Sequence, residues 1–142
     1  MIRVALPTIT TRYQVKTHKK TDHSSNMKLN KIDYLEFATT DIAASKRFFT
    51  DAFGWAFVDY GPEYTAFIDQ GVDGGFFKAD KVATSEDGAP LTVFYTDSIE
   101  RVLSKVQSAG GMIAKPIFDF PGGRRFQFSE PGGNEMAVWT DK

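Results

Sequence analysis

Apolar and polar residues along this chain change their spacing in a regular order from residue 32 onward. Residues 32–39 alternate as a half-buried strand does, and residues 42–53 carry apolar side chains at the three- and four-residue spacing of a helix. Thr40 and Asp41 are typical of a helix start, and Gly54 is typical of a helix end. Further strands are predicted at 55–60, 64–69 and 76–79, with turns at 61–62 and 71–75.

The same order of elements recurs after a polar linker at residues 80–90. A strand at 91–95 is followed by a second Thr-Asp pair, Thr96 and Asp97, and by a helix that ends near Gly110. The remaining strands are predicted at 112–118, 124–129 and 135–140. The second half of the chain therefore repeats the first: one strand, one helix and three strands.

The two halves match in helix length as well as in order. Asp41 and Gly54 are 13 residues apart, and so are Asp97 and Gly110. One such βαβββ unit alone would leave a face of its sheet uncovered, so two units are expected to fold together. The pattern predicts an α+β domain in which two βαβββ modules form a curved mixed sheet.

Residues 1–26 lack this pattern and form a basic, polar leader. They contain five Lys or Arg residues and one Asp, which gives a net charge of +4. We interpret them as a flexible leader or as an arm that packs on a partner subunit, and a targeting or anion-binding tail is a third interpretation. The domain itself is expected to occupy residues 27–142, with module one at about 30–80 and module two at about 90–141.

Composition narrows the function without identifying it. The absence of Cys excludes disulfides, thiolate nucleophiles and Cys-ligated metals, and it fits a cytoplasmic protein. The net charge of -1 gives no reason to expect nucleic acid as a partner, and no apolar run approaches the roughly 18 residues of a membrane span. The 13 Phe, 5 Tyr and 2 Trp residues can fill a core or line a pocket for a flat ligand.

Three segments of the repeat share features with one protein family. Residues 39–55 run Thr-Thr-Asp-Ile through Arg-Phe-Phe to Phe-Gly-Trp, residues 74–78 read Gly-Gly-Phe-Phe-Lys, and residues 130–134 read Glu-Pro-Gly-Gly-Asn. These segments resemble the first-module helix, the glycine-rich closing strand and the turn before the last strand of the vicinal oxygen chelate superfamily, which includes glyoxalases, bleomycin resistance proteins and dioxygenases. The resemblance covers roughly residues 30–140. It implies helices on the outer face of the sheet, a cleft on its concave side and a homodimer.

Metal-dependent members of that superfamily place a His on the first strand of a module and a Glu on the last. The corresponding His positions in this chain are Tyr34 and Leu91, and the second Glu position is Ala137. The closing strand of module one offers only residues 75–77, which are Gly, Phe and Phe, and both His residues of the chain lie in the leader. We therefore expect no metal ion and no other cofactor, although ligands displaced by one strand step would change this interpretation.

Strand alternation indicates which side chains line the cleft. Trp55 is expected in the core and Trp139 in the cleft. Phe126 and Phe128 are expected to cover a helix, which turns Arg125 and Gln127 toward the cleft. The predicted ligand-binding residues are Tyr34, Glu36, Phe77, Leu91, Arg125, Gln127, Glu135 and Trp139.

Glu36 is the one candidate catalytic residue, as a general base. Glu36 and Arg125 are compatible with an internal ion pair or a rim salt bridge, and alternatively with polar anchors for a charged or amide-bearing ligand.

These observations predict a glyoxalase/bleomycin-resistance-like protein that binds a small aromatic or polar molecule in a metal-free cleft. The alternative is a lyase, isomerase or dioxygenase of the same superfamily that uses acid–base residues or an unrecognised divalent metal ion. Whether the protein is an enzyme stays open. The resemblance implies a homodimer, and neither nucleic acid nor a membrane is expected as a partner.

Overall fold

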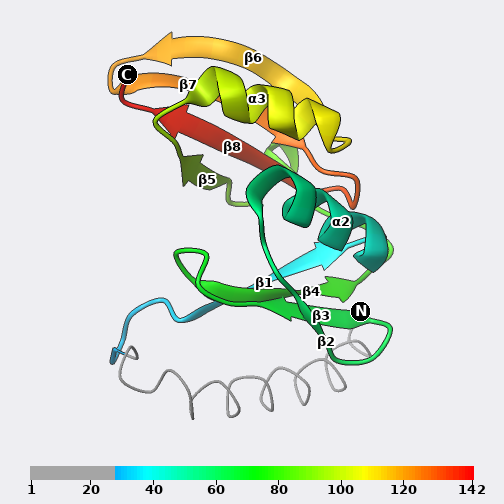
Figure 1. Cartoon of the computed structure of the whole chain (residues 1–142). Helices are drawn as coiled ribbons and strands as arrows, with labels where there is room; N and C mark the ends of the chain where they lie inside the picture. Colours follow the sequence, from blue (N-terminus) through cyan, green and yellow to red (C-terminus); the bar gives the residue numbers. More distant parts are fainter. Residues whose placement is uncertain (1–27) are drawn as a thin grey trace.

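The computed structural model of the chain describes residues 28–142, so the predicted leader lies outside the described residues. Figure 1 shows an arrangement of two similar halves, each with one helix beside a sheet. Module one contains β1 (Tyr34–Thr39), α2 (Ile42–Phe53), β2 (Val58–Asp59), β3 (Tyr64–Phe67) and β4 (Asp73–Lys78). A short 3-10 turn, η2 (Ser85–Asp87), lies in the linker. Module two contains β5 (Thr92–Tyr95), α3 (Ile99–Ser108), β6 (Met112–Phe120), β7 (Gly123–Ser129) and β8 (Glu135–Thr140).

The strands form two four-stranded sheets with the same topology. The first sheet has the order β1-β4-β3-β2, and the second has the order β5-β8-β7-β6. In each sheet the first and last strands of the module pair in parallel, and the other neighbours pair antiparallel. The predicted α+β fold of two βαβββ modules is confirmed. In the described part of one chain, the predicted curved sheet is divided into one sheet for each module.

The boundaries of two predicted strands in module one differ from the structure. The predicted turn at 71–75 is wrong for residues 73–75, which belong to β4. A β-carbon on Gly75 would lie 2.3 Å from the Tyr64 hydroxyl, so glycine is required there by close packing within a strand and not by a turn. The strand predicted at 55–60 is reduced to Val58–Asp59, because Trp55 is drawn into the core and is only 6% exposed.

The two helices begin differently although the sequence repeats a Thr-Asp pair. Asp41 is the N-cap of α2 as predicted, and its Oδ1 atom accepts a 3.0 Å hydrogen bond from the Ala44 amide. The N-cap of α3 is Ser98, so the predicted cap at the second Thr-Asp pair is wrong. The Thr96 hydroxyl accepts a 3.1 Å bond from the Ser98 amide, just as the Thr39 hydroxyl accepts one from the Asp41 amide. The helices differ in the cap itself, because the Ser98 side chain makes no capping hydrogen bond.

One apolar core joins both helices and both sheets. The helix α2 contributes aromatic side chains to each module: Phe49 stacks on Trp55 at 4.7 Å between ring centroids, and Phe53 stacks on Phe94 of β5 at 4.3 Å. Phe48 lies 5.7 Å from Phe128 of β7. Trp55 is therefore a core residue, as predicted. Because both sheets turn one face to this shared core, their other faces point away from it (Figure 1).

A buried carboxylate fixes the turn before β8 against the start of α2. Glu130 is 2% exposed, and its carboxylate accepts hydrogen bonds from the Ser45 hydroxyl at 2.8 Å, the Gly132 amide at 2.7 Å and the Asn134 side chain at 2.7 Å. The Asn134 side chain also donates a 2.8 Å bond to the Ala38 carbonyl of β1. This network, which we call the module joint, ties module two to module one through polar groups that are out of contact with water.

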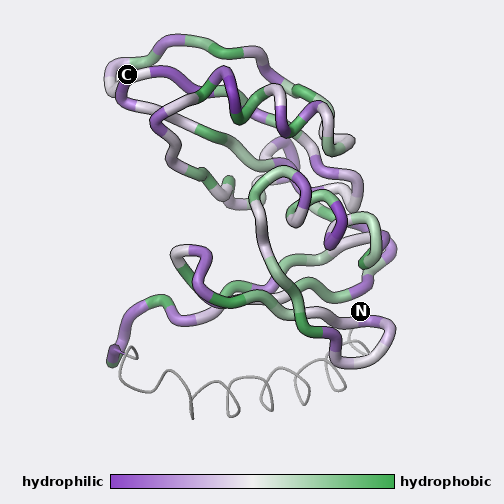
Figure 2. The backbone as a smooth tube through the Cα atoms, in the orientation of Figure 1, coloured by the Kyte–Doolittle hydropathy of each residue, from purple (hydrophilic) through white to green (hydrophobic). Residues whose placement is uncertain are grey.

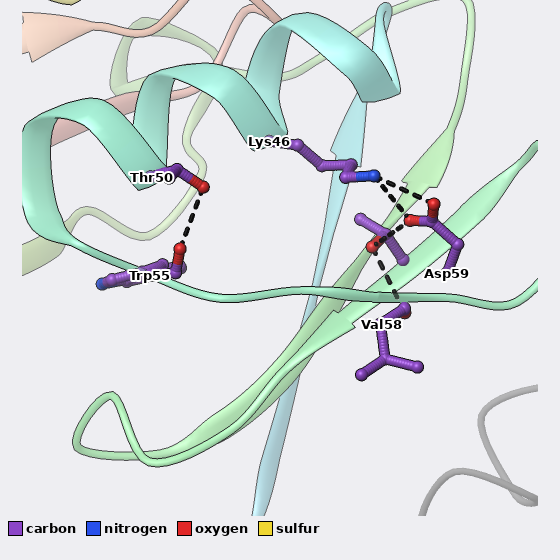
Figure 3. Close-up of polar contacts among 6 residues, drawn as sticks. Lys46, Thr50, Trp55, Val58 and Asp59 are labelled. Carbon is purple, nitrogen blue, oxygen red and sulfur yellow. Dashed lines mark hydrogen bonds and ion pairs between the residues drawn. The ribbon is translucent and has the colours of Figure 1, made fainter.

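Polar contacts also hold the segment that leads from α2 to β2 (Figure 3). The Thr50 hydroxyl donates to the Trp55 carbonyl at 2.9 Å, and the Lys46 ammonium contacts the Asp59 carboxylate at 2.8 Å. The bond to Lys46 is the main reason why the pKa of Asp59 lies below its ordinary value. These contacts tie the segment that leads to β2 to the helix α2.

No helix among residues 28–142 has the length and apolar character needed to cross a membrane.

Candidate functional site

Each sheet has one face in the core and one face that no helix among residues 28–142 covers, which we call the first and second open faces. Figure 2 shows both hydrophobic and hydrophilic residues along the strands. In β1 they alternate from Tyr34 to Phe37, as expected for a sheet with two unlike faces. On the core side lie aromatic residues such as Phe76 and Phe126. On each strand, the residues next to these core residues point to the open face. All eight predicted ligand-binding residues lie at alternating positions on, or directly beside, the two open faces.

On the first open face, two tyrosines from different strands are joined. The hydroxyls of Tyr34 and Tyr64 are 2.6 Å apart, and Tyr64 is only 2% exposed. Burial raises the pKa of Tyr64 far above its ordinary value, and the bond to Tyr34 and the nearby charge of Glu36 add to the rise. Glu36 lies opposite Gly75 in the parallel pair of β1 and β4, and the missing side chain of Gly75 leaves room for the Tyr64 hydroxyl.

The first open face thus brings three predicted residues together and adds one that sequence reasoning missed. Tyr34, Glu36 and Phe77 all lie there, and Phe77 packs against Tyr64. The signal for Tyr64 was its alternation with the buried Phe67 on β3. Two phenols beside a carboxylate can hold a hydrogen-bonded proton chain, but a catalytic role for Glu36 stays a prediction.

On the second open face, polar side chains from β7 and β8 form a hydrogen-bonded chain. The Arg125 Nη2 atom donates to the Gln127 Oε1 atom at 2.9 Å, and the Gln127 amide nitrogen donates to Glu135 at 3.0 Å. The other Glu135 oxygen accepts bonds from the Ser85 amide at 2.9 Å and the Ser85 hydroxyl at 2.7 Å. The bond from the Ser85 hydroxyl is the largest cause of the lowered pKa of Glu135, so this carboxylate is held in its ionised form.

Beside this polar chain runs a row of large side chains that crosses the whole sheet. Cross-strand pairing places Tyr95 beside Trp139, Trp139 beside Arg125, and Arg125 beside Phe118. The Tyr95 and Trp139 rings are 5.2 Å apart, and the Arg125 guanidinium lies 5.8 Å from the Phe118 ring. We call these four residues the aromatic row.

The structure therefore assembles four predicted residues, Arg125, Gln127, Glu135 and Trp139, on the second open face. Sequence reasoning missed Tyr95 and Phe118. Tyr95 follows from the same alternation as Leu91, which lies just before β5 and is half-buried. Phe118 was hidden because the pairing of β6 with β7 shifts register between Lys115 and Phe118, so that simple alternation fails along β6.

A direct ion pair between Glu36 and Arg125 is not formed. The two residues lie on different sheets, and Arg125 donates instead to Gln127.

Two hollows lie along α2 and α3, and one of them shares Tyr95 with the second open face. One, of about 400 Å³, has a floor that includes Phe53 and Phe94 and is edged by Arg101 and Lys105. The other, of about 340 Å³, shares Arg101 and Lys105 and includes Asp51. Neither contains any residue predicted to bind a ligand.

The family model of the Glyoxalase/Bleomycin resistance protein/Dioxygenase superfamily matches residues 31–138. The chain belongs to this superfamily. The sequence resemblance to the vicinal oxygen chelate proteins is thereby confirmed for the family and for the fold.

Relatives within the glyoxalase superfamily are similar over most of this chain. The anthracycline biosynthesis protein DnrV of Streptomyces peucetius is 30% identical over 124 residues, which cover 75% of this chain and 45% of that protein. CFP32 of Mycobacterium tuberculosis is 28% identical over 120 residues, which cover 75% of this chain and 44% of that protein. The chain thus spans less than half the length of these curated relatives.

Solved glyoxalase-superfamily structures share the fold at low sequence identity. A glyoxalase-related enzyme from Fulvimarina pelagi superimposes with a TM-score of 0.66 at 21% identity, covering 79% of this chain and 88% of that chain. The fosfomycin resistance protein FosX from Listeria monocytogenes gives a TM-score of 0.66 at 14% identity, covering 80% of this chain and 94% of that chain.

The residues of this glyoxalase-family chain do not fit the divalent metal ion that the resemblance associates with its enzymes. The closing strands place Gly75 opposite Glu36 in module one and Ala137 opposite Val93 in module two, so neither strand supplies a carboxylate at that position. Among residues 28–142, no group of three or more His, Asp or Glu side chains could hold an ion. We therefore derive no chemical step through a metal ion.

Proposed function

We propose that the chain binds a small aromatic or polar molecule on its second open face without the help of a metal ion. The aromatic row beside the hydrogen-bonded chain from Arg125 to Glu135 carries this proposal. Sites for small molecules combine aromatic walls with a few fixed polar groups, and this face has both. Tyr95 is 53% exposed and Phe118 is 37% exposed, so this side of the sheet exposes apolar surface that a ligand could bury.

We also propose that two copies of the chain form a homodimer. Both open faces point away from the shared core, so each is only one wall of a cleft, and a second copy can supply the opposite wall. The strands β1 and β5 are edge strands of their sheets, which leaves backbone groups available for pairing with another copy. Sedimentation velocity should give a mass of about twice 15.8 kDa, and a monomer at all concentrations would contradict the dimer.

A thermal-shift screen of small aromatic compounds tests the binding proposal. Bound ligands stabilise only the folded chain, so binders should raise the Tm. Replacing Trp139 by Ala should weaken each binder by about tenfold or more, since truncating a central aromatic residue commonly costs that much. The matched control is Arg101→Ala, which changes the hollow along α3 and leaves the second open face intact.

Two outcomes of this screen would count against the proposal. If Arg101→Ala abolishes binding and Trp139→Ala does not, the ligand occupies the helix side of the molecule. If chelators remove binding from the wild-type chain, a metal ion takes part. The proposal predicts equal affinity before and after chelator treatment.

A further inference from the structure

The Arg125 guanidinium on the second open face is incompletely bonded. Its Nη2 atom donates to Gln127, but its Nε atom is buried and has no hydrogen-bond partner among the described residues. A buried N–H group without an acceptor is unfavourable and uncommon in folded proteins. Within residues 28–142, the second open face therefore lacks a hydrogen-bond acceptor for the Arg125 Nε atom.

The Glu135 carboxylate on this face bonds to other donors than Arg125. Both oxygens of Glu135 are already used, one by Ser85 and the other by Gln127. Gln127 stands between the two charges: its oxygen faces Arg125 and its nitrogen faces Glu135. The amide therefore acts as a spacer that keeps Arg125 and Glu135 from forming a direct ion pair.

A second cation adds to the positive charge beside the aromatic row. The Lys115 ammonium lies 6.0 Å from the Phe118 ring, and the Arg125 guanidinium lies 5.8 Å from the same ring. Lys115 is the cross-strand partner of Gln127, which lies two residues from Arg125 on the same face of β7. The Asp141 carboxylate at the other end of the row is occupied, because it accepts the Tyr95 hydroxyl at 2.8 Å and lies 3.7 Å from the Lys142 ammonium.

The neighbours of Arg125 also restrict the shape of a ligand. Arg125 has Trp139 on one side and Phe118 on the other, on adjacent strands whose backbones are about 5 Å apart. A flat ring that lies on Trp139 can carry an acidic group to the N–H edge of the guanidinium. The guanidinium offers a planar pair of donors that matches a carboxylate.

We infer that the second open face selects planar aromatic anions, with a carboxylate or a similar acidic group on Arg125 and the ring on Trp139. This inference rests on the proposed function and adds the charge and shape of the ligand to it. Lys115 contributes a second, weaker attraction for the anion. Gln127 orients Arg125 and keeps its positive charge available.

Calorimetric titration with two probes of nearly the same shape tests the inference. The probes are 2-naphthoate, which is an anion, and 2-naphthamide, which is neutral. The wild-type chain should bind 2-naphthoate at least about tenfold more tightly than 2-naphthamide, because a charge-assisted bidentate contact replaces a neutral one. Added salt should weaken the binding of 2-naphthoate and leave that of 2-naphthamide nearly unchanged.

Substitutions at two neighbouring residues test whether Arg125 causes the preference for 2-naphthoate. Arg125→Gln should bind the two probes with similar affinity. Arg124→Gln is the matched control, because Arg124 points to the other face of the same strand and pairs with Glu100 at 2.6 Å. The control should keep the preference for 2-naphthoate. If Arg125→Gln fails to fold, a crystal structure of the wild-type chain with 2-naphthoate shows whether the carboxylate lies on Arg125.

The possible failures are distinguishable. Equal affinity of the wild-type chain for both probes overturns the inference about charge and leaves the proposed function standing. Binding of neither probe contradicts the proposed function for bicyclic aromatics, and the inference falls with it. A preference for 2-naphthoate that survives in Arg125→Gln shows that another cation selects the anion, which also overturns the inference.

Discussion

Replacing Glu130 with Ala is expected to lower the free energy of unfolding by about 3–4 kcal/mol, because several buried donors lose their acceptor together. The carboxylate accepts from the Ser45 hydroxyl, the Gly132 amide and the Asn134 side chain, and Glu130 is 2% exposed. Water cannot reach these donors without opening the module joint. Urea denaturation followed by circular dichroism measures the change.

Glu100→Ala is the matched control for the module joint. Glu100 is also a glutamate in contact with a polar partner, but its ion pair with Arg124 lies on the surface. Exposed ion pairs contribute little to stability, so this variant should unfold close to the wild-type midpoint. Equal losses in the two variants would show that the module joint does not hold the two modules together.

Replacing Phe49 with Ala is expected to cost about 3–5 kcal/mol, since it leaves a large cavity in a packed aromatic core. Phe49 is fully buried, and its ring lies 5.0 Å from Phe48, 4.7 Å from Trp55 and 5.3 Å from Phe76. These contacts connect α2 with the first sheet. Thermal and urea unfolding should both show the loss.

Phe118→Ala separates core aromatics from those on the open face. Phe118 is 37% exposed and lies in the aromatic row, so its removal should cost much less stability than the removal of Phe49. Its removal should instead weaken ligand binding. If Phe118→Ala proves as destabilising as Phe49→Ala, the second open face serves folding and not recognition.

Much of the fold is predictable because the helix start and stop residues agree with the spacing of apolar residues between them. The Asp41 cap and the Gly54 stop define α2 from sequence alone, and Gly54 indeed adopts the left-handed conformation at φ 75°. The failure at the second Thr-Asp pair shows the limit of the repeat. The N-cap there is Ser98 and not a member of the Thr-Asp pair, so the helix starts one residue later than the pair indicates.

The site residues were predictable wherever strict alternation holds. Arg125 and Trp139 lie on regular strands, and counting by two placed them on the open face. The position of Phe118 depends on a register shift in β6, which has no clear sequence signal. The contact between Tyr34 and Tyr64 spans 30 residues and depends on the space above Gly75, so only the folded chain shows it.

A crystal structure of the chain grown with 2-naphthoate tests metal-free binding on the second open face most directly. We expect the ring on Trp139, the carboxylate on the Arg125 guanidinium, and no metal ion between ligand and protein. A ring bound in the hollow beside Arg101 and Lys105, or a carboxylate held by a metal ion, would contradict it.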